Sequence, residues 1–330
     1  MPEGSDPTGP HAFELSAIED LAAVDLDHVK NTELLDAELP DPRFADASYL
    51  HWLYDLNPLG RGIYDSIDDD EGVRVAHYGL IPQQYRDADG PQPFVFSLNA
   101  VSRSGAQRRG FFSEIGQKIW GRAQEEGTQV VIGVTNGNST WPVKKQGWRV
   151  LGPMPVKLVV PSPVRPRNVV SHPVTPAFLD SAVFTDLAQG LDASPARHWT
   201  NCWTPEYLRW RLATPHVAPY TVHVSPELFA VSTITHTKGV PFAVILKLLP
   251  RDGRFGPMPA DQMISAICRH HRAPSAVYAG HNRHVVVKGI RLPEKLKPVP
   301  LNLVMLSLTD KVDQLTFQLD TYEFFDMDAY

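Results

Sequence analysis

The sequence predicts an α/β (α+β) protein built from two lobes, each with a mixed central sheet flanked by helices. Two observations favour this fold class. The chain has 330 residues, which is long for one ordinary domain and comfortable for two of roughly 100–200 residues each. Strands, one helix and further strands also follow one another in the same order in both halves, and a proline-rich stretch at residues 161–176 separates the halves.

The elements of the first half follow from hydrophobic spacing and from turn residues. Apolar positions at helical spacing predict short helices, and an acidic turn at residues 68–72 predicts a hairpin. Gly127 is a natural stop for the longest helix. The predicted elements are, in order, one or two helices over 12–35, a helix over 48–56, strands at 63–67, 73–81 and 94–103, a helix over 111–126 and a buried strand at 129–135.

The second half repeats this style without a tandem repeat in its sequence. We therefore expect an N-terminal lobe at residues 1–160, a proline-rich linker at 161–176 and a C-terminal lobe at 177–330. The predicted elements of the second half are strands near 220–224, 228–235 and 240–249, a helix over 260–272, and strands near 275–279, 284–288 and 301–308.

The charge balance restricts the classes of partner. The chain has 31 basic and 37 acidic side chains and a formal net charge of −6, whereas generic binding to nucleic acid or anionic membranes favours a basic balance. We expect neither partner. The two cysteines exclude a disulfide framework. The polar residues 1–10 do not resemble a signal peptide, and no apolar run approaches the ~20 residues of a membrane span, so we expect a cytoplasmic protein.

The most informative block runs from Phe94 to Val160. After the strand at 94–103, a loop with Arg108, Arg109 and Gly110 opens directly into a helix. Unpaired backbone N–H groups at a helix N-terminus and the helix dipole favour an anion. The two arginines add charge-assisted donors for phosphate oxygens. The pattern therefore indicates a pyrophosphate site, although a loop of this kind alone is a weak signal.

The same block resembles the GCN5-related N-acetyltransferase (GNAT) superfamily. The acyl-CoA loop of that family reads Gln/Arg-x-x-Gly-x-Gly/Ala, and Gln107-x-x-Gly110 matches it. A short strand ending in Thr135-Asn136 follows, and then Lys144–Trp148, which is similar to the family's Tyr-x-x-x-Gly-Phe segment. The resemblance implies acyl-CoA as co-substrate. The residues implied to bind it are Leu98, Asn99, Ala100, Val101, Gln107, Arg108, Arg109, Gly110, Phe111, Phe112, Asn136 and Ser139.

Two positions depart from the family pattern. Phe112 occupies the last position of the loop motif, where the family has Gly or Ala, and a ring there would reshape the pyrophosphate turn or pack toward the acyl chain. Val143 stands where many members place the Tyr that protonates the leaving thiolate. No tyrosine general acid is therefore carried over.

The resemblance implies direct attack of a neutral amine on the acyl thioester. Most of the rate would come from holding the reactants together. Backbone N–H groups near Ala100 and Val101 would contact the thioester carbonyl. His77 and His198 are the candidate general bases, because histidine titrates near neutral pH. An ordinary buried histidine is the alternative reading for each.

The whole chain resembles more loosely the long-chain N-acyltransferases that acylate the aminosugar of teicoplanin-type glycopeptide antibiotics. That resemblance implies a small-molecule or glycopeptide acceptor held in a cleft between the lobes. Aromatic side chains would line the cleft, although each is as easily a core residue. The aromatic candidates are Tyr78, Trp141, Trp199 and Trp203, with Trp52 and Trp210 as further ones.

Other functions remain open from the residues alone. Peptidoglycan aminoacyl transferases pair similar lobes but take aminoacyl-tRNA, and no basic stripe is evident here. A non-catalytic acyl-CoA sensor would also explain Val143. Neither His270-His271 nor His281-x-x-His284 has the further ligands of a structural metal site, so we expect no metal.

Overall fold

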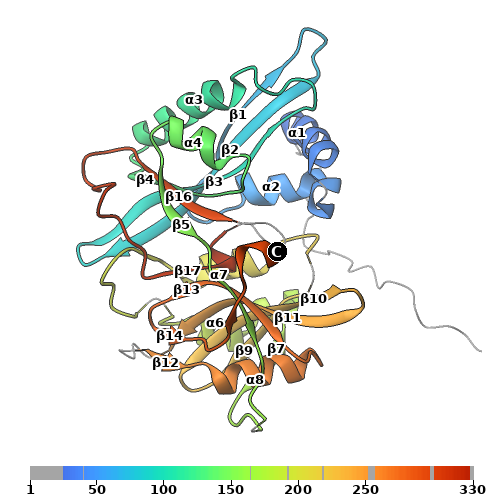
Figure 1. Cartoon of the computed structure of the whole chain (residues 1–330), viewed down its shortest axis with the longest axis vertical. Helices are drawn as coiled ribbons and strands as arrows, with labels where there is room; N and C mark the ends of the chain where they lie inside the picture. Colours follow the sequence, from blue (N-terminus) through green and yellow to red (C-terminus); the bar gives the residue numbers. More distant parts are fainter. Residues whose placement is uncertain are drawn as a thin grey trace, which may run out of the picture.

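The computed structural model describes residues 25–39, 41–163, 165–191, 193–217, 219–251, 257–297 and 301–327. Two β-sheets lie one above the other along the long axis of the molecule, and helices flank each sheet (Figure 1). The expected α/β class with two lobes is confirmed. Within these residues no helix is both long and apolar enough to cross a bilayer. The expectations for residues 1–24, including a helix beginning at residue 12, fall outside the described residues.

The first sheet has the strand order β1-β2-β3-β4-β16-β5, and β8 pairs with the C-terminal end of β2. Only β3 and β4 run parallel, and the other neighbours are antiparallel. The strands are β1 (Ile63–Asp68), β2 (Arg74–Asp87), β3 (Gly90–Ser102), β4 (Val130–Thr135), β5 (Arg149–Pro153), β8 (Thr200–Asn201) and β16 (Asn302–Ser307).

Helices cover both faces of this sheet because its strands alternate apolar side chains between the two faces. Helix α3 (Phe111–Glu125) packs Ile115 and Ile119 against Tyr78 and Val95 on one face. Helices α1 (Leu26–Glu38) and α2 (Ala47–Asp55) cover the other face, where Leu98 lies in the larger core. The short helices η2 (Pro42–Ala45) and α4 (Thr140–Lys145) complete this lobe.

The second sheet has the order β15-β6-β13-β11-β10-β9-β7, with β17 paired to β13. Helix α8 (Asp261–His270) lies on one face and buries Met263, Ile264 and Ile267 in a separate core. The strands are β6 (Val156–Val159), β7 (Val170–Pro173), β9 (Thr221–Val224), β10 (Leu228–Thr237), β11 (Val240–Pro250), β13 (Ala276–Asn282), β15 (Ile290–Arg291) and β17 (Thr321–Glu323). The smaller elements are α5 (Pro176–Leu179), α6 (Ala182–Ala188), α7 (Pro205–Leu212), β12 (Met258–Pro259), β14 (Val285–Val286), η3 (Glu294–Leu296) and η4 (Phe324–Asp326).

Two strands cross between the sheets in a way that the sequence does not predict. After β5 the chain passes Met154 and Pro155 and enters the second sheet as β6, which pairs with β13. In return, β16 enters the first sheet between β4 and β5. Residues 161–176, which we expected to form a linker, include β7, and β7 pairs with β9 in the second sheet. Hydrophobic spacing indicates a strand but does not specify its partner, so the expected lobe boundaries do not follow the sheets.

A single large core spans the space between the sheets. It contains Phe96 and Ile132 of the first sheet together with Phe229 and Val244 of the second. A buried polar cluster crosses the same region. Lys247 contacts Asp326 at 2.6 Å and Glu323 at 3.2 Å, and none of the three side chains is solvent-exposed. Gln83 of β2 donates to the Asp326 carbonyl, so the C-terminal segment ties the two sheets together.

Electrostatics in this cluster depend on Lys247. Burial alone would lower the pKa of Lys247, but Asp326 and Glu323 hold that pKa above its ordinary value. Burial raises the pKa of Glu323, and the Lys247 charge opposes that shift only partly. Two carboxyl groups therefore depend on one ammonium group.

We predict that Lys247→Met lowers the free energy of unfolding by about 3–5 kcal/mol, because it leaves buried acidic groups without their partner. Lys288→Met is the control: Lys288 is 71% exposed and lies 3.5 Å from Asp261, and loss of such a surface pair costs about 1 kcal/mol or less. Urea denaturation of both variants measures the difference. Equal small effects would contradict the stated role of Lys247.

Candidate functional site

The two parallel strands of the first sheet separate at their C-terminal ends. β3 and β4 pair only from Phe94 to Ser97 and from Val130 to Gly133. Beyond that point β3 continues to Ser102, whereas the last residues of β4 pair with β16 on their other side. A wedge therefore opens between β3 and β4, and the backbone groups of residues 98–102 on that side are not paired with β4.

A β-bulge shapes the β3 side of this wedge. His77 lies opposite Val101, whereas Gly79 lies opposite Leu98, so β3 carries one extra residue. Asn99 sits in this bulge with φ 55°, a left-handed conformation that is uncommon outside glycine. Bulges re-aim the following backbone and side chains, and here the following residues, 100–102, lie on the wedge.

The loop after β3 carries the expected anion-binding features. Arg108 and Gly110 both adopt left-handed φ, 65° and 88°, and no side chain caps the N-terminus of α3. Gln107, Arg108, Arg109 and Gly110 are exposed. Ser104 anchors the loop, because its backbone N–H and hydroxyl donate to the Glu38 carboxylate at 2.8 and 2.7 Å. The loop thus presents free helix N–H groups and two guanidinium groups next to the wedge.

The phenylalanines of the loop motif have separate surroundings. The Arg109 guanidinium lies 5.1 Å from the centre of the Phe111 ring. Phe112 stacks on Tyr78 at 5.0 Å and lies edge-on to Trp120. Phe112, at the position where the family motif has a small residue, is thus accommodated by packing under α3. Both rings are half-buried.

The end of β4 and the helix α4 form the opposite wall. Asn136 and Ser139 form a tight turn, in which the side-chain carbonyl of Asn136 accepts a hydrogen bond from the Ser139 backbone N–H at 3.1 Å. Val143 is only 3% exposed and belongs to the core under α3. Gln146 donates to the Ser113 hydroxyl at 2.7 Å and so links α4 to the first turn of α3.

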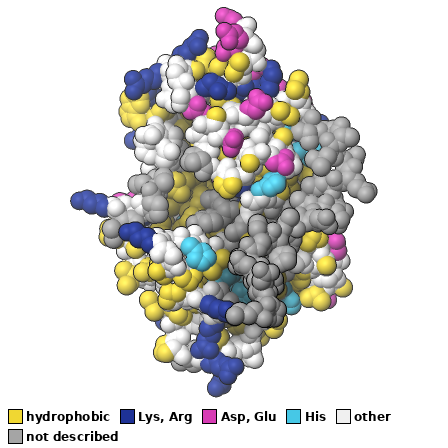
Figure 2. All heavy atoms as spheres, turned by 90° about the vertical axis from the view of Figure 1, so that its right-hand side faces the viewer, with side chains coloured by type: hydrophobic (Ala, Val, Ile, Leu, Met, Phe, Trp, Pro, Cys, Tyr) yellow, Lys and Arg dark blue, Asp and Glu magenta, His cyan; other side chains and the backbone are white. Residues whose placement is uncertain are grey.

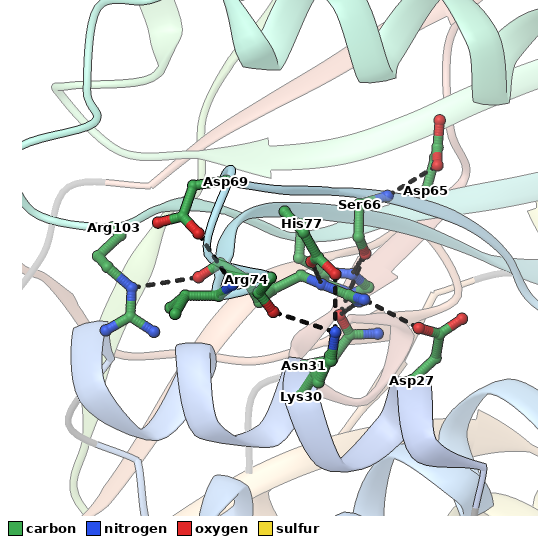
Figure 3. Close-up of polar contacts among 12 residues, drawn as sticks. Asp27, Lys30, Asn31, Asp65, Ser66, Asp69, Arg74, His77 and Arg103 are labelled. Atoms are coloured by element: carbon green, nitrogen blue, oxygen red, sulfur yellow. Dashed lines mark hydrogen bonds and ion pairs between the residues drawn. The ribbon is translucent and has the colours of Figure 1, made fainter.

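The structure does not favour His77 as a base that contacts an acceptor. Its ring is 1% exposed. One ring nitrogen, Nε2, lies 3.0 Å from the Tyr54 hydroxyl, and the other, Nδ1, lies 2.9 Å from the Ser66 hydroxyl. Burial, assisted by the electrostatic effects of Arg74 and His28, lowers the pKa of His77 to about 3. Figure 3 shows His77 among Ser66, Asn31 and Arg74, on the side of α1 that faces the strands.

His198 lies apart from His77, in the segment before β8. Its backbone N–H donates to the Asp320 carboxylate at 3.1 Å, and its side chain is half-buried. The next residue, Trp199, bridges to Leu319 and packs on Phe94 with ring centres 5.0 Å apart. This places His198 on the side of the first sheet that faces the second lobe.

Most of the expected aromatic lining is core. Trp203 and Tyr78 are each 1% exposed, and Trp52 stacks on Trp210 in the large core with ring centres 4.6 Å apart. These four aromatic side chains are therefore core residues and not the lining of a cleft. A large ring on an amphipathic element is more often buried than presented to a ligand. Trp141 is 61% exposed, with the Lys145 ammonium 3.6 Å from its ring centre.

Two cavities complete the description. The first, about 360 Å³, lies beside β5 and β16; its lining includes Arg149, Met154, His281, Leu303 and Phe317. The second, about 870 Å³, lies at the edge strand β1, and Arg61, Tyr64 and Arg122 are among its lining residues. Sequence reasoning missed both cavities, because each is assembled from segments far apart in the chain.

The second cavity also borders the most metal-like group of the described residues, His28, His51 and Asp55. Both imidazoles contact the same Asp55 oxygen, at 2.7 and 2.9 Å. These hydrogen bonds account for the arrangement without an ion. The histidines considered from the sequence do not gather around carboxylates: His281 bonds to the Leu319 carbonyl, and His270 lies near Thr221.

On the face shown in Figure 2, basic side chains form separate groups, and acidic side chains lie at the upper end and in the upper half of the face. No continuous basic stripe crosses the coloured, described part of this face.

We predict that stability falls as the pH drops below about 6.5. Burial lowers the pKa of both His77 and His223 to about 3, so between pH 6.5 and 3 the unfolded chain binds protons that the folded chain does not. Each histidine then removes up to about 1.4 kcal/mol of unfolding free energy per pH unit. Urea denaturation at pH 7.5, 6.0 and 5.0 tests this, and an unchanged free energy would contradict the buried neutral state.

Comparison with known proteins supports the fold. No family model and no curated protein matches the chain. A conserved protein from Enterococcus faecalis, described as a probable N-acyltransferase, has a TM-score of 0.57 at 10% identity and covers 86% of this chain and 70% of its own. A GCN5-related N-acetyltransferase from Anabaena variabilis has a TM-score of 0.57 at 11% identity, covering 86% and 71%. A structure from Pyrococcus horikoshii aligns over 90% of both chains, with a TM-score of 0.54 at 11% identity.

At these identities the likeness concerns the fold alone, and the matched share of the chain includes both sheets. The protein therefore has the fold of the GCN5-related N-acetyltransferase structures.

Proposed function

We propose that the protein is an acyl-CoA-dependent N-acyltransferase. The observation that carries the proposal is the wedge between β3 and β4, directly beside an uncapped helix N-terminus. A pyrophosphate at α3 would place the attached pantetheine arm along residues 98–102, whose backbone groups on that side are not paired with β4. The solved structures with the same fold include N-acetyltransferases, which supports the same chemistry here.

In the proposed reaction, the nitrogen of a neutral amine attacks the thioester carbonyl carbon. The C–N bond forms, the C–S bond breaks, and CoA leaves as a thiolate that takes up a proton. Backbone N–H groups at Ala100 and Val101 would stabilise the oxyanion. Val143 is buried and has no acidic proton, so that proton would come from the attacking amine, from water or from another side chain. Of the two histidines considered, His77 is buried and His198 is partly exposed.

The finer assignment is a long acyl chain and the aminosugar of a glycopeptide antibiotic precursor. The sequence resemblance supports it. The cavity of about 360 Å³ supports it too, because Leu303, which lines the cavity, pairs with the end of β4. Such a cavity, partly apolar and between the two sheets, suits an acyl chain or a small acceptor. A non-catalytic acyl-CoA-binding protein is the second candidate, favoured by the buried Val143.

A thermal-shift titration with CoA, acetyl-CoA, octanoyl-CoA and decanoyl-CoA tests donor binding. A rise in melting temperature with every CoA species supports the pyrophosphate site, and a larger rise with long chains supports the long-chain assignment. Release of free thiol with an amine panel that includes glucosamine derivatives then separates an enzyme from a sensor. Binding without thiol release would favour the sensor, and no shift at all would overturn the proposal.

We predict that Gly110→Ala weakens CoA binding at least about 10-fold, because a side chain there obstructs the close approach of phosphate to the backbone. Gly127→Ala is the matched control. It lies at the other end of α3 with φ 89°, against 88° for Gly110, and a Cβ at either position meets no atom within 4 Å. The two variants should lose similar stability, measured by urea denaturation. Equal CoA affinities, measured by calorimetry, would contradict the assignment.

A further inference from the structure

A buried chain of hydrogen bonds runs from a guanidinium group near α1 to the bulge in β3. Arg74, which is 6% exposed, is held by Asp68 at 2.6 Å and Asp27 at 2.8 Å, and it also donates to the side-chain carbonyl of Asn31. Figure 3 shows Arg74, Asn31 and Asp27 gathered between α1 and the strands above it. From Asn31 the chain continues through Ser66, His77 and Tyr54 to Asn99.

The direction of every hydrogen bond in this chain follows from Arg74. A guanidinium can only donate, so Asn31 must turn its carbonyl oxygen toward it. The Ser66 hydroxyl also donates to that oxygen, at 3.1 Å. Its single proton is then used, so Ser66 must accept from Nδ1–H of His77.

The second half of the chain is then also determined. A neutral His77 with its proton on Nδ1 has an acceptor at Nε2. The Tyr54 hydroxyl donates to this nitrogen at 3.0 Å, and the Tyr54 oxygen accepts from the Asn99 side-chain amide at 3.2 Å. The low pKa of His77 agrees with a neutral ring. Four links thus donate in the same direction, from Asn99 through Tyr54, His77 and Ser66 to the Asn31 carbonyl, which also accepts from Arg74.

Tyr54 reaches Asn99 because residue 79 of the neighbouring strand β2 is a glycine. The Tyr54 ring is fully buried and lies against the backbone of β2. A Cβ at Gly79 would clash directly with the Tyr54 hydroxyl. Gly79 is also one of the two residues between which the register of β2 and β3 shifts. The glycine, the tyrosine and the bulge therefore occupy one site.

We propose that Tyr54 and His77 are positioning residues that hold Asn99 in its left-handed conformation and so fix the bulge that aims residues 100 and 101 into the wedge. This rests on the proposed acyl transfer, in which the N–H groups of those residues meet the thioester carbonyl. The side chain of Asn99 is directed into the protein by its bond to Tyr54. Its contribution to the wedge is the shape of the backbone.

The first test reads the hydrogen-bond chain itself. In the full-length protein, ¹⁵N NMR of the His77 ring should show protonated Nδ1 and unprotonated Nε2, unchanged between pH 8 and pH 5. Tyr54→Phe should remove the hydrogen bond to Nε2 and shift that signal. A proton on Nε2 in the unaltered protein would overturn the assigned direction. This readout requires no CoA and no acceptor.

The second test asks whether the chain holds the bulge. Tyr54→Phe should move the backbone amide signals of Asn99 and Ala100. Tyr85→Phe is the matched control, because Tyr85 is equally buried, lies on β2 and has a hydroxyl without a hydrogen-bond partner. Amide signals at residues 99 and 100 that stay in place in Tyr54→Phe would overturn the proposal, whatever the activity of the protein.

The third test links the bulge to the reaction. With any amine that the protein acylates, Tyr54→Phe should lower kcat by about 10- to 100-fold, as expected for a small misplacement of the reacting groups. KM for acetyl-CoA should change less than about 3-fold, because the loop at Gly110 is untouched. Gly110→Ala should instead change KM for acetyl-CoA more than it changes kcat. A Tyr54→Phe enzyme with unchanged kcat would overturn the positioning role, whereas failure of the unaltered protein to bind CoA would refute only the proposed function.

Discussion

The separation of two parallel strands is the constraint on which the rest of the structure depends. Parallel neighbours in a sheet normally exchange hydrogen bonds along their whole overlap, and leaving such groups unpaired has a free-energy cost unless another partner replaces them. β3 and β4 pair over only four residues each. The structure must therefore supply other partners on both sides of the gap, and much of the first lobe does so.

On the β4 side, β16 supplies the partner. Asn302 and Leu303 bond to Thr135 and Val134, the two residues that β3 no longer reaches. On the β3 side, β2 holds the strand through the bulge, and α1 anchors the following loop through Glu38 and Ser104. The wedge is thus held open from the outside rather than by groups within it, which leaves its backbone donors free for a ligand.

Local signals in the sequence predicted most of the secondary structure. The helix beginning at Phe111 and the strands near 228–235 and 240–249 follow from apolar spacing and glycine stops, and the structure confirms them. The position of the loop from Gln107 to Gly110, between β3 and α3, was also predictable, because it depends on local signals. The contacts that the sequence did not predict join segments far apart in the chain. No local pattern shows that β16 belongs to the first sheet, that Trp203 is core, or that Tyr54 and Ser66 occupy both ring nitrogens of His77.

The insertion of β16 into the first sheet also affects how the chain reaches its native state. Thr135 and Asn302, which are hydrogen-bonded, lie 167 residues apart in the chain. During synthesis β4 leaves the ribosome long before β16 exists, so one edge of β4 is without its native partner while the intervening residues are made. Contacts of such high sequence separation slow folding, and an open strand edge invites pairing with other chains. The first sheet therefore stays incomplete until β16 has been synthesised.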